Sequence, residues 1–395
     1  MKSAEWAADG KLRQPNFLGV RDDKNARDVH GERESLQHGA REVGDMTTRT
    51  SSSRRRSRPL RSGRATARPR RRSAASSSNA LIRQLEEIEA TGGNGTLGFG
   101  RGKTLRVSSL DKVYFPELGT TKGELMRYYA AMAPAILPAI KDRPLVLKRY
   151  PEGIEGPSFF QQNAGDAVPE HVRTAPVTTE SGQLVERIVG GDLLTLLYTV
   201  QIGTIAVHAW QARIGHLELA DMSTIDLDPG EDVPFREVVA LAVKIREQLA
   251  ALKLQAGIKT SGSSGVHIVL PLPTGTTFGE SAELATAISR RVAEANSKRA
   301  TLERSIKNRP TGTIYVDAQQ NAKGKSVVAA YSVRARAKAT VSAPIAWTDL
   351  RAALRLEQFT VETMPIRFRR IGDIWSAAMK RRNSRRALEA LLGGL

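Results

Sequence analysis

The sequence predicts a domain of mixed helix and strand, of the α/β or α+β class, over residues 101–395. From about residue 104 the chain is regularly apolar to its last residues, and this region is long enough for an independent core. Within it, helical stripes of apolar residues occur together with short β-branched runs that Gly or Pro bounds. These two observations carry the prediction of the fold class.

Three segments of this region read as helices. "TKGELMRYYAAMAPAILPAI" begins a helix at Thr121, and Glu124 follows at the spacing of a capping box. "FREVVALAVKIREQLAALKL" has apolar residues at 235, 238, 242, 245, 249 and 252, with Pro234 at its first turn. "FRRIGDIWSAAMKRRNSRRALEALL" reads as one helix with a basic face, which is more often solvated than bound to DNA.

Two other segments read as strands. "GVHIVLPL" and "GTIYVDAQ" are short runs rich in β-branched residues, and each is bounded by Gly or Pro. We find no internal repeat, so an array of repeated units is not expected.

The first hundred residues differ from the rest in charge. The formal net charge of the chain is +19, and residues 46–84 contain twelve arginines and no acidic residue. Such a run cannot bury enough apolar surface to order itself, so we predict a disordered Arg/Ser/Gly-rich linker over residues 46–100. Its natural partner is a polyanion such as a phosphate backbone. The alternatives are a solvated linker without a specific partner and a transit peptide, which the preceding 45 residues disfavour.

Composition also limits the chemistry. The chain has no cysteine, so a metal ion would need oxygen or imidazole ligands. No run of 18 or more apolar residues exists and "MKSAEWAADGKLRQ" is no secretory signal, so we expect no membrane partner.

The stretch "STIDLDPG" places two aspartates one residue apart in an apolar strand. Because side chains alternate along a strand, Asp226 and Asp228 should share one face while Ile225 and Leu227 point into the core. Two carboxylates on one face repel unless a cation lies between them, and nucleotidyl-transfer sites hold Mg²⁺ or Mn²⁺ in this way. The alternative is turn chemistry before Pro-Gly, because Asp favours the start of turns.

Three further features follow in order along the chain. "KTSGSSGVHIVLPL" joins a Ser/Gly-rich turn, of the kind that cradles phosphate, to a strand that carries His267. "IYVDAQQN" puts Asp317 on a third strand, and "AAYSVRARAK" supplies Arg334 and Arg336. Guanidinium groups suit the oxygens of a triphosphate. These features, together with the two aspartates and in this order, indicate a nucleotidyl-transfer site more specifically than any one of them alone.

With these motifs, the chain from about residue 104 resembles the polymerase domain of bacterial DNA ligase D, of the archaeo-eukaryotic primase superfamily. The resemblance also runs through "SSLDKVYFPELGTTKGELMRYYAAMAP", "FFQQNA" and "VHAWQAR". It implies a primase-polymerase fold, in which a central mixed or antiparallel sheet carries the aspartates between flanking helices. Residues 7–29 resemble the last strands of a ligase domain, so residues 1–45 are expected to be a poorly ordered remnant of one. The adenylation lysine motif is absent, and ligase activity is not expected.

The resemblance assigns roles position by position. It makes Asp226, Asp228 and Asp317 the catalytic residues and the ligands of two metal ions. The nucleotide-binding positions it implies are Lys148, His208, Ser261, His267, Gln320 and Arg334. Lys112 and Lys122 match lysines that grip a 5′-phosphate of DNA, and Phe159 and Phe160 match an aromatic pair that stacks on the template. The alternatives are solvated surface lysines and a core "FF" pair.

Three positions depart from the family pattern. Ser264 stands where a Lys that faces the triphosphate is common, Gln162 also replaces a common Lys, and Ala318 replaces an aromatic residue. One lost charge-assisted bond costs about 1.5–3 kcal/mol, so weaker nucleotide binding is expected.

The sequence thus predicts a DNA repair polymerase that adds nucleotides to primer 3′-hydroxyls at gaps or double-strand breaks in non-homologous end joining. The resemblance implies two Mn²⁺ or Mg²⁺ ions, NTP or dNTP substrates, and a preference for ribonucleotides and Mn²⁺. It implies as partners DNA ends with a 5′-phosphate and bacterial Ku, in the bacterial cytoplasm at the nucleoid. Whether a separate ligase polypeptide also docks here is left open by the sequence. The alternatives are a weak or inactive DNA-end-binding remnant and a primase that starts strands unaided.

Overall fold

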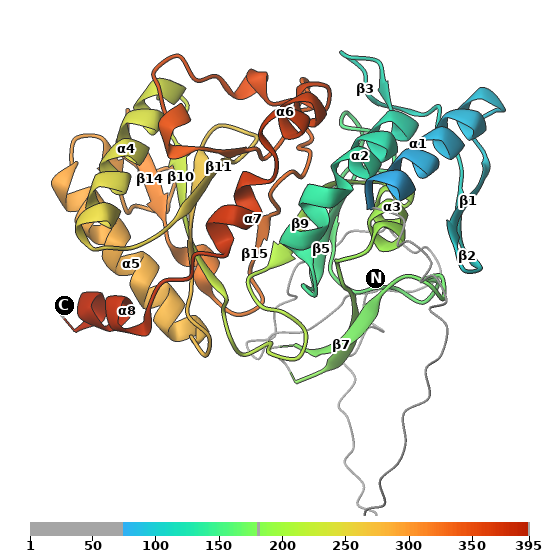
Figure 1. Ribbon diagram of the computed structural model, residues 1–395. Coiled ribbons are helices and arrows are strands. Elements are labelled where there is room, and N and C mark those ends of the chain that lie inside the picture. The colour runs from blue at the N-terminus through green and yellow to red at the C-terminus, as the bar shows by residue number, and fades with distance from the viewer. Residues whose placement is uncertain (1–73, 180–181, 394–395) are drawn as a thin grey trace, which may run out of the picture. The chain divides into compact units, whose positions relative to one another are not determined.

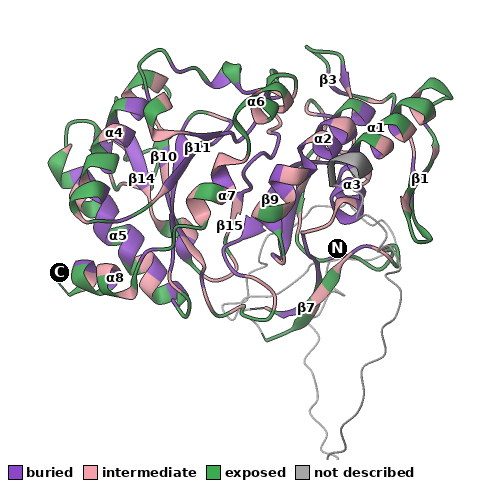
Figure 2. Ribbon diagram, in the orientation of Figure 1, coloured by how far each residue is buried: buried purple, intermediate pink, exposed green. Residues whose placement is uncertain are grey.

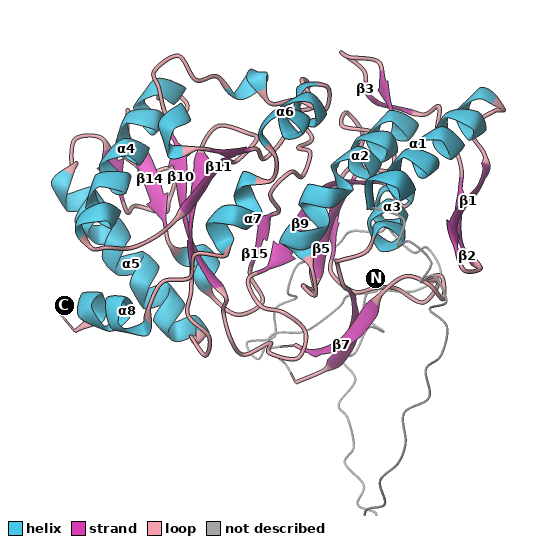
Figure 3. Ribbon diagram, viewed as in Figure 1, coloured by secondary structure: helices cyan, strands magenta, loops and turns pink. Residues whose placement is uncertain are grey.

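The computed structural model describes residues 74–179 and 182–393, with side chains from Ser78 onward (Figure 1). This part of the chain mixes helices and strands, which confirms the predicted fold class (Figure 3). Its α-helices are α1 (Ala74–Ala90), α2 (Lys122–Ile140), α3 (Leu193–Gln201), α4 (Phe235–Ala251), α5 (Phe278–Ala295), α6 (Thr363–Ile371), α7 (Ile374–Met379) and α8 (Arg385–Leu392).

A six-stranded sheet carries the predicted aspartates. Its strands lie in the order β13 (Ala300–Thr301), β14 (Ile314–Asp317), β10 (Met222–Pro229), β12 (Val266–Pro271), β11 (Gly257–Thr260) and β16 (Pro344–Ile345). All neighbours are antiparallel except β13 and β14, so the sheet is mixed, as expected. Helices α4 and α5 pack against it.

A second sheet of four strands lies beside helices α2 and α3. Its order is β15 (Ser326–Val328), β9 (Thr204–Trp210), β5 (Leu145–Arg149) and β6 (Phe159–Gln161). Three hairpins complete the strands: β1 (Gly95–Gly100) with β2 (Lys103–Val107), β3 (Val113–Phe115) with β4 (Thr120–Thr121), and β7 (Thr174–Thr178) with β8 (Leu184–Ile188).

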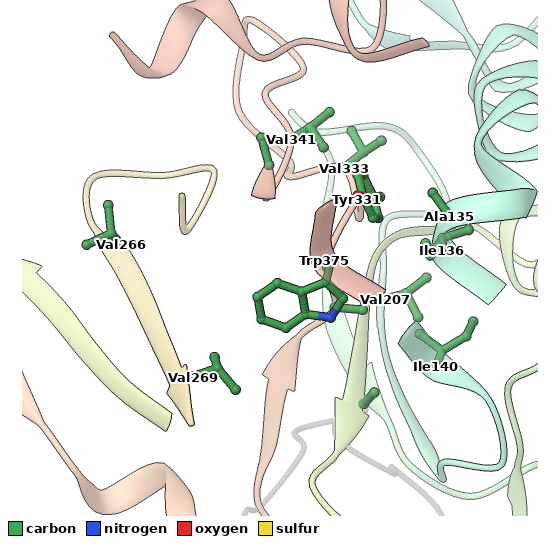
Figure 4. Packing of buried hydrophobic residues seen from close by; sticks show 14 of the residues in the cluster. Ala135, Ile136, Ile140, Val207, Val266, Val269, Tyr331, Val333, Val341 and Trp375 are labelled. Atoms are coloured by element: carbon green, nitrogen blue, oxygen red, sulfur yellow. The ribbon is translucent and has the colours of Figure 1, made fainter. Parts of the chain in front are cut away.

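One hydrophobic core connects the two sheets. The inner strands and the inward faces of the helices are buried (Figure 2). The indole of Trp375 on α7 lies between Val269 of β12 and Val207 of β9, and all three are buried (Figure 4). Apolar burial of this kind is the main favourable contribution to folding. It therefore fixes how the two sheets, and the side chains they carry, face each other.

The helix signals in the sequence are largely confirmed. Thr121 caps α2: its hydroxyl accepts from the Glu124 backbone N–H, and the Thr121 N–H donates to the Glu124 carboxylate. Helix α4 also forms as predicted, although Pro234 is its N-cap residue and not part of its first turn. Among the helices of the described residues, none is long and apolar enough to cross a bilayer.

The prediction of one C-terminal helix was wrong. The segment forms α6, α7 and α8, because Gly372 (φ 72°) ends α6 and Asp373 caps α7. Asn383 then bonds to the backbone of Gln255 and Pro271, after which Ser384 caps α8. At both breaks the helix ends at local backbone and capping interactions, although the helical periodicity of the sequence continues.

The predicted disordered linker was wrong over residues 74–100, where α1 and β1 form. The reason is a short apolar stripe that the surrounding charge conceals: Leu81, Leu85 and Leu97 are buried against the core, and α1 packs on α2. The rest of the linker and the ligase-like remnant at residues 1–45 lie outside the described residues and stay predictions.

Removing the Leu85 side chain tests whether α1 belongs to the domain. Leu85 is 0% exposed, so Leu85→Ala should lower the free energy of unfolding by about 2–5 kcal/mol. Chemical denaturation measures this change. Glu87→Ala, on the exposed side of the same helix, is the control and should stay within about 0.5 kcal/mol. Equal effects of the two changes would show that α1 is not part of the core.

Candidate functional site

The strand register brings the predicted acidic residues together. Asp226 on β10 lies directly opposite His267 on β12 and directly opposite Asp317 on β14. Ile225 and Leu227 are fully buried, which confirms the predicted alternation of faces. Because directly opposite residues share a face of the sheet, the three side chains start from one patch.

Most of the predicted nucleotide-binding residues line one open pocket of about 230 Å³ beside this patch. The predicted residues in its wall are His208, Asp226, Asp228, Ser261, Ser264, His267, Gln320 and Arg334. They come from both sheets and from the segments that follow β11, β14 and β15. Asp317 and Lys148 are not among the lining residues. The pocket therefore gathers two carboxylates, two imidazoles and a guanidinium from distant parts of the chain.

Asp226 is surrounded by nitrogen groups. Nε2 of His267 lies 3.3 Å from Oδ2 of Asp226. Burial alone would raise the pKa of Asp226, but His267, Lys259 and Arg334 together hold it below its ordinary value. Burial lowers the pKa of His267. Asp226 is thus an ionised carboxylate in a pocket with nearby cations.

Asp228 is already paired with an arginine. Nη1 of Arg309 lies 3.4 Å from its Oδ2, and the guanidinium carbon lies 4.7 Å from the ring centre of Tyr315. Burial, and then the charge of Asp226, raise the pKa of Asp228 in spite of Arg309. Arg309 was missed in the sequence, where a single arginine in the "KNRPTG" loop carries no signal of its own.

Asp317 is held by its own neighbourhood. Its carboxylate accepts hydrogen bonds from the Tyr315 hydroxyl (3.2 Å), the Gln319 backbone N–H (2.7 Å) and Nε2 of Gln320 (3.0 Å). Next to it, Asn321 bonds in both directions to the backbone of Thr224 and so fixes the turn against β10. Asp317 therefore lies beside the other two aspartates but does not point into the pocket with them.

The Ser/Gly turn after β11 is compact. Oγ of Ser261 accepts the backbone N–H groups of Ser263 (3.1 Å) and Gly265 (3.0 Å), so the turn bonds these groups internally and does not present them to a phosphate. A Cβ at Gly265 would lie 1.8 Å from the Leu227 carbonyl oxygen, so only glycine fits there. Arg336 donates to Oγ of Ser263, and Ser264 is exposed at the tip. The positive charge at this turn comes from arginines on a neighbouring loop.

The aromatic pair Phe159–Phe160 is exposed. The two side chains are 44% and 60% exposed, which excludes the alternative that they are core residues. Nζ of Lys148 lies 5.4 Å from the Phe160 ring centre, and the Arg149 guanidinium lies 5.1 Å from that of Phe159. The Phe160 ring also lies edge-on to His208. This is an aromatic platform with adjacent cations at the rim of the pocket.

His208 completes this side of the pocket as a neutral group. Burial, followed by the charges of Arg334 and Lys259, lowers the pKa of His208 to about 3. Its Nδ1 is buried and has no hydrogen-bond partner among the described residues. His208 therefore offers a polar atom and no charge to a ligand.

Lys112 and Lys122 lie together at the β3–β4 hairpin and the start of α2, and neither lines the pocket. Lys122 is 5% exposed, and its Nζ donates to the Ser108 carbonyl oxygen at 2.7 Å. Burial, and then the charge of Lys112, lower the pKa of Lys122 to about 8. Lys112 forms an ion pair with Glu152 at 2.5 Å. The alternative of two solvated surface lysines fails for Lys122.

A family model described as "LigD, primase-polymerase domain" matches residues 121–375. The chain belongs to the LigD primase-polymerase family. It is 30% identical to the multifunctional non-homologous end joining protein LigD of Pseudomonas aeruginosa, over 97% of this chain and 41% of that one. It is 32% identical to the LigD of Mycobacterium tuberculosis over 70% of this chain and 37% of that one. The chain thus spans less than half the length of these relatives.

A solved structure supports the same family. The polymerase domain of Mycobacterium tuberculosis ligase D in complex with DNA has a TM-score of 0.65 and 30% identity to this chain. The match covers 71% of this chain and 99% of that domain. The primase-polymerase fold expected from the sequence is therefore confirmed.

The donor atoms of the site fit a hard divalent cation, because carboxylate oxygens are the ligands that Mg²⁺ and Mn²⁺ prefer. Within residues 74–179 and 182–393, however, no three acidic or imidazole side chains surround one point. Asp228 is bound by Arg309 and Asp317 by Gln320. A metal ion held by all three aspartates would compete with these two contacts for the carboxylate oxygens.

Removing the Arg309 charge tests this competition. Arg309 and a cation seek the same carboxylate, and a partly exposed ion pair is worth about 0.2–1 kcal/mol. Arg309→Gln should therefore tighten Mn²⁺ binding by about 1.4- to five-fold, as measured by the free Mn²⁺ signal in electron paramagnetic resonance. Arg299→Gln, which removes a surface ion pair with Glu237, is the control. Unchanged or weaker Mn²⁺ binding in Arg309→Gln would contradict the competition.

The pKa of Lys122 predicts a pH dependence, if this lysine grips a 5′-phosphate as the sequence predicts. Phosphate binds the protonated ammonium, so the preference for a 5′-phosphorylated DNA end over a 5′-hydroxyl end should be constant below about pH 8 and decline above it. Fluorescence anisotropy with the two DNA ends measures this preference between pH 7 and 9.5. Lys122→Arg keeps its charge throughout and should abolish the decline. A flat profile in the unaltered chain would remove Lys122 from the phosphate site.

Proposed function

We propose that this chain is a DNA-directed nucleotidyltransferase that extends primer 3′-hydroxyls at gaps or broken ends in non-homologous end joining. The observation that carries the proposal is one pocket wall in which Asp226 and Asp228 face Arg334 and the Ser/Gly turn. A phosphate-binding module has no use for carboxylates that repel its ligand. A nucleotidyltransferase needs both the cation-binding and the anion-binding groups.

Each residue has a role that suits its environment. Asp226, Asp228 and Asp317 would hold two Mn²⁺ or Mg²⁺ ions, which activate the primer hydroxyl and stabilise the leaving pyrophosphate when bound. Arg334 would bind triphosphate oxygens with Lys148 and Ser261, and Gln320 would release Asp317 for the metal. The nucleotide contact predicted for His267 would need one of its ring nitrogens to leave Asp226 or Lys259. His208 stays neutral at pH 7 and would act through hydrogen bonds. Ser264 leaves the tip of the Ser/Gly turn without its own cation.

DNA would lie across the aromatic platform and the lysine pair. Exposed Phe159 and Phe160 offer faces for a template base, and aromatic stacking is worth about 1–3 kcal/mol per base. Lys112 and Lys122 would bind the 5′-phosphate on the far side of a gap. The DNA complex of the Mycobacterium tuberculosis domain supports a DNA partner for this family member. The relatives' names place them in non-homologous end joining, and Ku and a separate ligase polypeptide stay predictions.

An inactive DNA-end-binding remnant is the second candidate. The Arg309–Asp228 ion pair and the serine at position 264 favour it, because both weaken the binding of metal ion and nucleotide. On this view the platform and the lysine pair would still bind DNA ends. The two candidates therefore differ in incorporation and not in DNA binding.

Primer extension on a 5′-phosphorylated gap separates them. The chain should add nucleotides with Mn²⁺ or Mg²⁺, and comparing NTPs with dNTPs gives its sugar preference. Asp226→Ala should abolish addition while binding to the gap changes by less than about two-fold, because Asp226 touches metal and not DNA. No incorporation by the unaltered chain, with DNA binding intact, would favour the remnant.

The reciprocal control is Lys112→Ala with Lys122→Ala. This double variant should bind the 5′-phosphorylated gap at least about ten-fold more weakly, since charge-assisted hydrogen bonds are worth about 1.5–3 kcal/mol. Its addition rate at saturating enzyme should stay near that of the unaltered chain. Normal extension by Asp226→Ala would show that the metal assignment is wrong.

A further inference from the structure

Lys259 is a buried lysine that the proposed catalysis does not use. It lies on β11, is 2% exposed, and forms no ion pair among the described residues. Its Nζ lies 2.7 Å from Nδ1 of His267 and 2.8 Å from Oγ of Ser342. Burying a lysine without a carboxylate partner is costly, and burial lowers the pKa of Lys259 well below its ordinary value, so its contacts with these two groups require an explanation.

The register places Lys259 in a row of polar residues across four adjacent strands. Asp317 on β14 is opposite Asp226 on β10, Asp226 is opposite His267 on β12, and His267 is opposite Lys259 on β11. Directly opposite side chains share one face, so the row runs along a single face of the sheet. Lys259 is the buried end of that row, and the aspartates are the end beside the pocket.

The hydrogen-bond directions along this row follow from its two ends. The Ser342 hydroxyl donates to the Thr260 carbonyl oxygen at 2.8 Å, so its oxygen accepts from Lys259. At the other end an ionised Asp226 can only accept, so Nε2 of His267 must carry a hydrogen. In a neutral imidazole, Nδ1 then has the free lone pair and accepts from Lys259. The chain of donors runs from Lys259 through His267 to Asp226.

We propose that Lys259 is a positioning residue, which holds His267 in the Nε2-protonated tautomer so that the imidazole donates to Oδ2 of Asp226. The bond fixes the Asp226 carboxylate and leaves Oδ1 as the oxygen that meets a ligand in the pocket. Partners behind a ligating group commonly set its orientation in this way. The value of this orientation for catalysis rests on the proposed function, whereas the tautomer itself does not.

The tautomer can be measured directly on the full chain. With ¹⁵N-labelled histidine, a long-range ¹H–¹⁵N correlation spectrum at pH 7.5 distinguishes the two tautomers for each of the six histidines. His267→Gln identifies the signal. We expect a hydrogen on Nε2 and a lone pair on Nδ1. A His267 signal with its hydrogen on Nδ1 alone would overturn the proposal without any further variant.

Lys259→Met, which keeps the length and removes the donor, should shift the His267 signals towards the other tautomer. Ser342→Ala is the matched control: it removes the other partner of Lys259 and should leave the His267 tautomer unchanged. An unchanged His267 spectrum in a folded Lys259→Met variant would refute the role of Lys259. If Lys259→Met does not fold, the spectrum of the unaltered chain still decides.

A kinetic measurement then tests the consequence for the pocket. Lys259→Met should lower kcat for nucleotide addition by about 10- to 100-fold, with the Kd for gapped DNA unchanged. Lys244→Met, at an exposed lysine on α4, should change neither. An unchanged kcat with a shifted tautomer would refute the positioning role. If the unaltered chain adds no nucleotide, the proposed function fails, and the tautomer measurement still stands on its own.

Discussion

The antiparallel pairing of β10 with β12 on one side and β14 on the other is the constraint on which the site depends. This pairing puts Asp226 level with both His267 and Asp317, although the three residues are up to 91 positions apart in the sequence. A shift of one residue in either register would turn a side chain of the row into the core. The buried apolar residues between the polar ones, such as Leu227 and Ile268, make such a shift costly.

The same sheet explains why several side chains of the site already contact one another. A cluster of carboxylates is unfavourable without partners, and in this chain protein groups supply them: the Arg309 guanidinium lies on Asp228, His267 lies on Asp226, and the Gln320 amide donates to Asp317. Arg309 also lies over the Tyr315 ring, which holds it in place. A divalent ion that binds at this site would compete with these groups for the carboxylate oxygens.

Sequence patterns anticipated what depends on local chemistry. The capping box at Thr121, the alternation around Asp226 and the strands of His267 and Asp317 all follow from short-range rules, and the structure has them. The roles of the site residues remain predictions. Lys259 and Arg309 could not be found, because their meaning comes from partners 8 and 81 positions away, across strands or from a loop. Helix α1 was missed because its buried leucines, Leu81 and Leu85, are few and become buried by packing on α2. Periodicity alone does not reveal that packing partner.

The ion pair between Lys112 and Glu152 has a consequence for which anion can reach the lysines. An internal phosphodiester carries one negative charge. At Lys112 it would only replace the Glu152 carboxylate, which is also a monoanion. A terminal phosphate carries close to two charges near neutral pH and three strong acceptor oxygens, so it can bind Lys112 and the buried Lys122 together. If the two lysines bind a 5′-phosphate as proposed, Glu152 would compete with the incoming anion and favour a dianion over a monoanion. A broken strand would then be distinguished from a continuous one before any base is read.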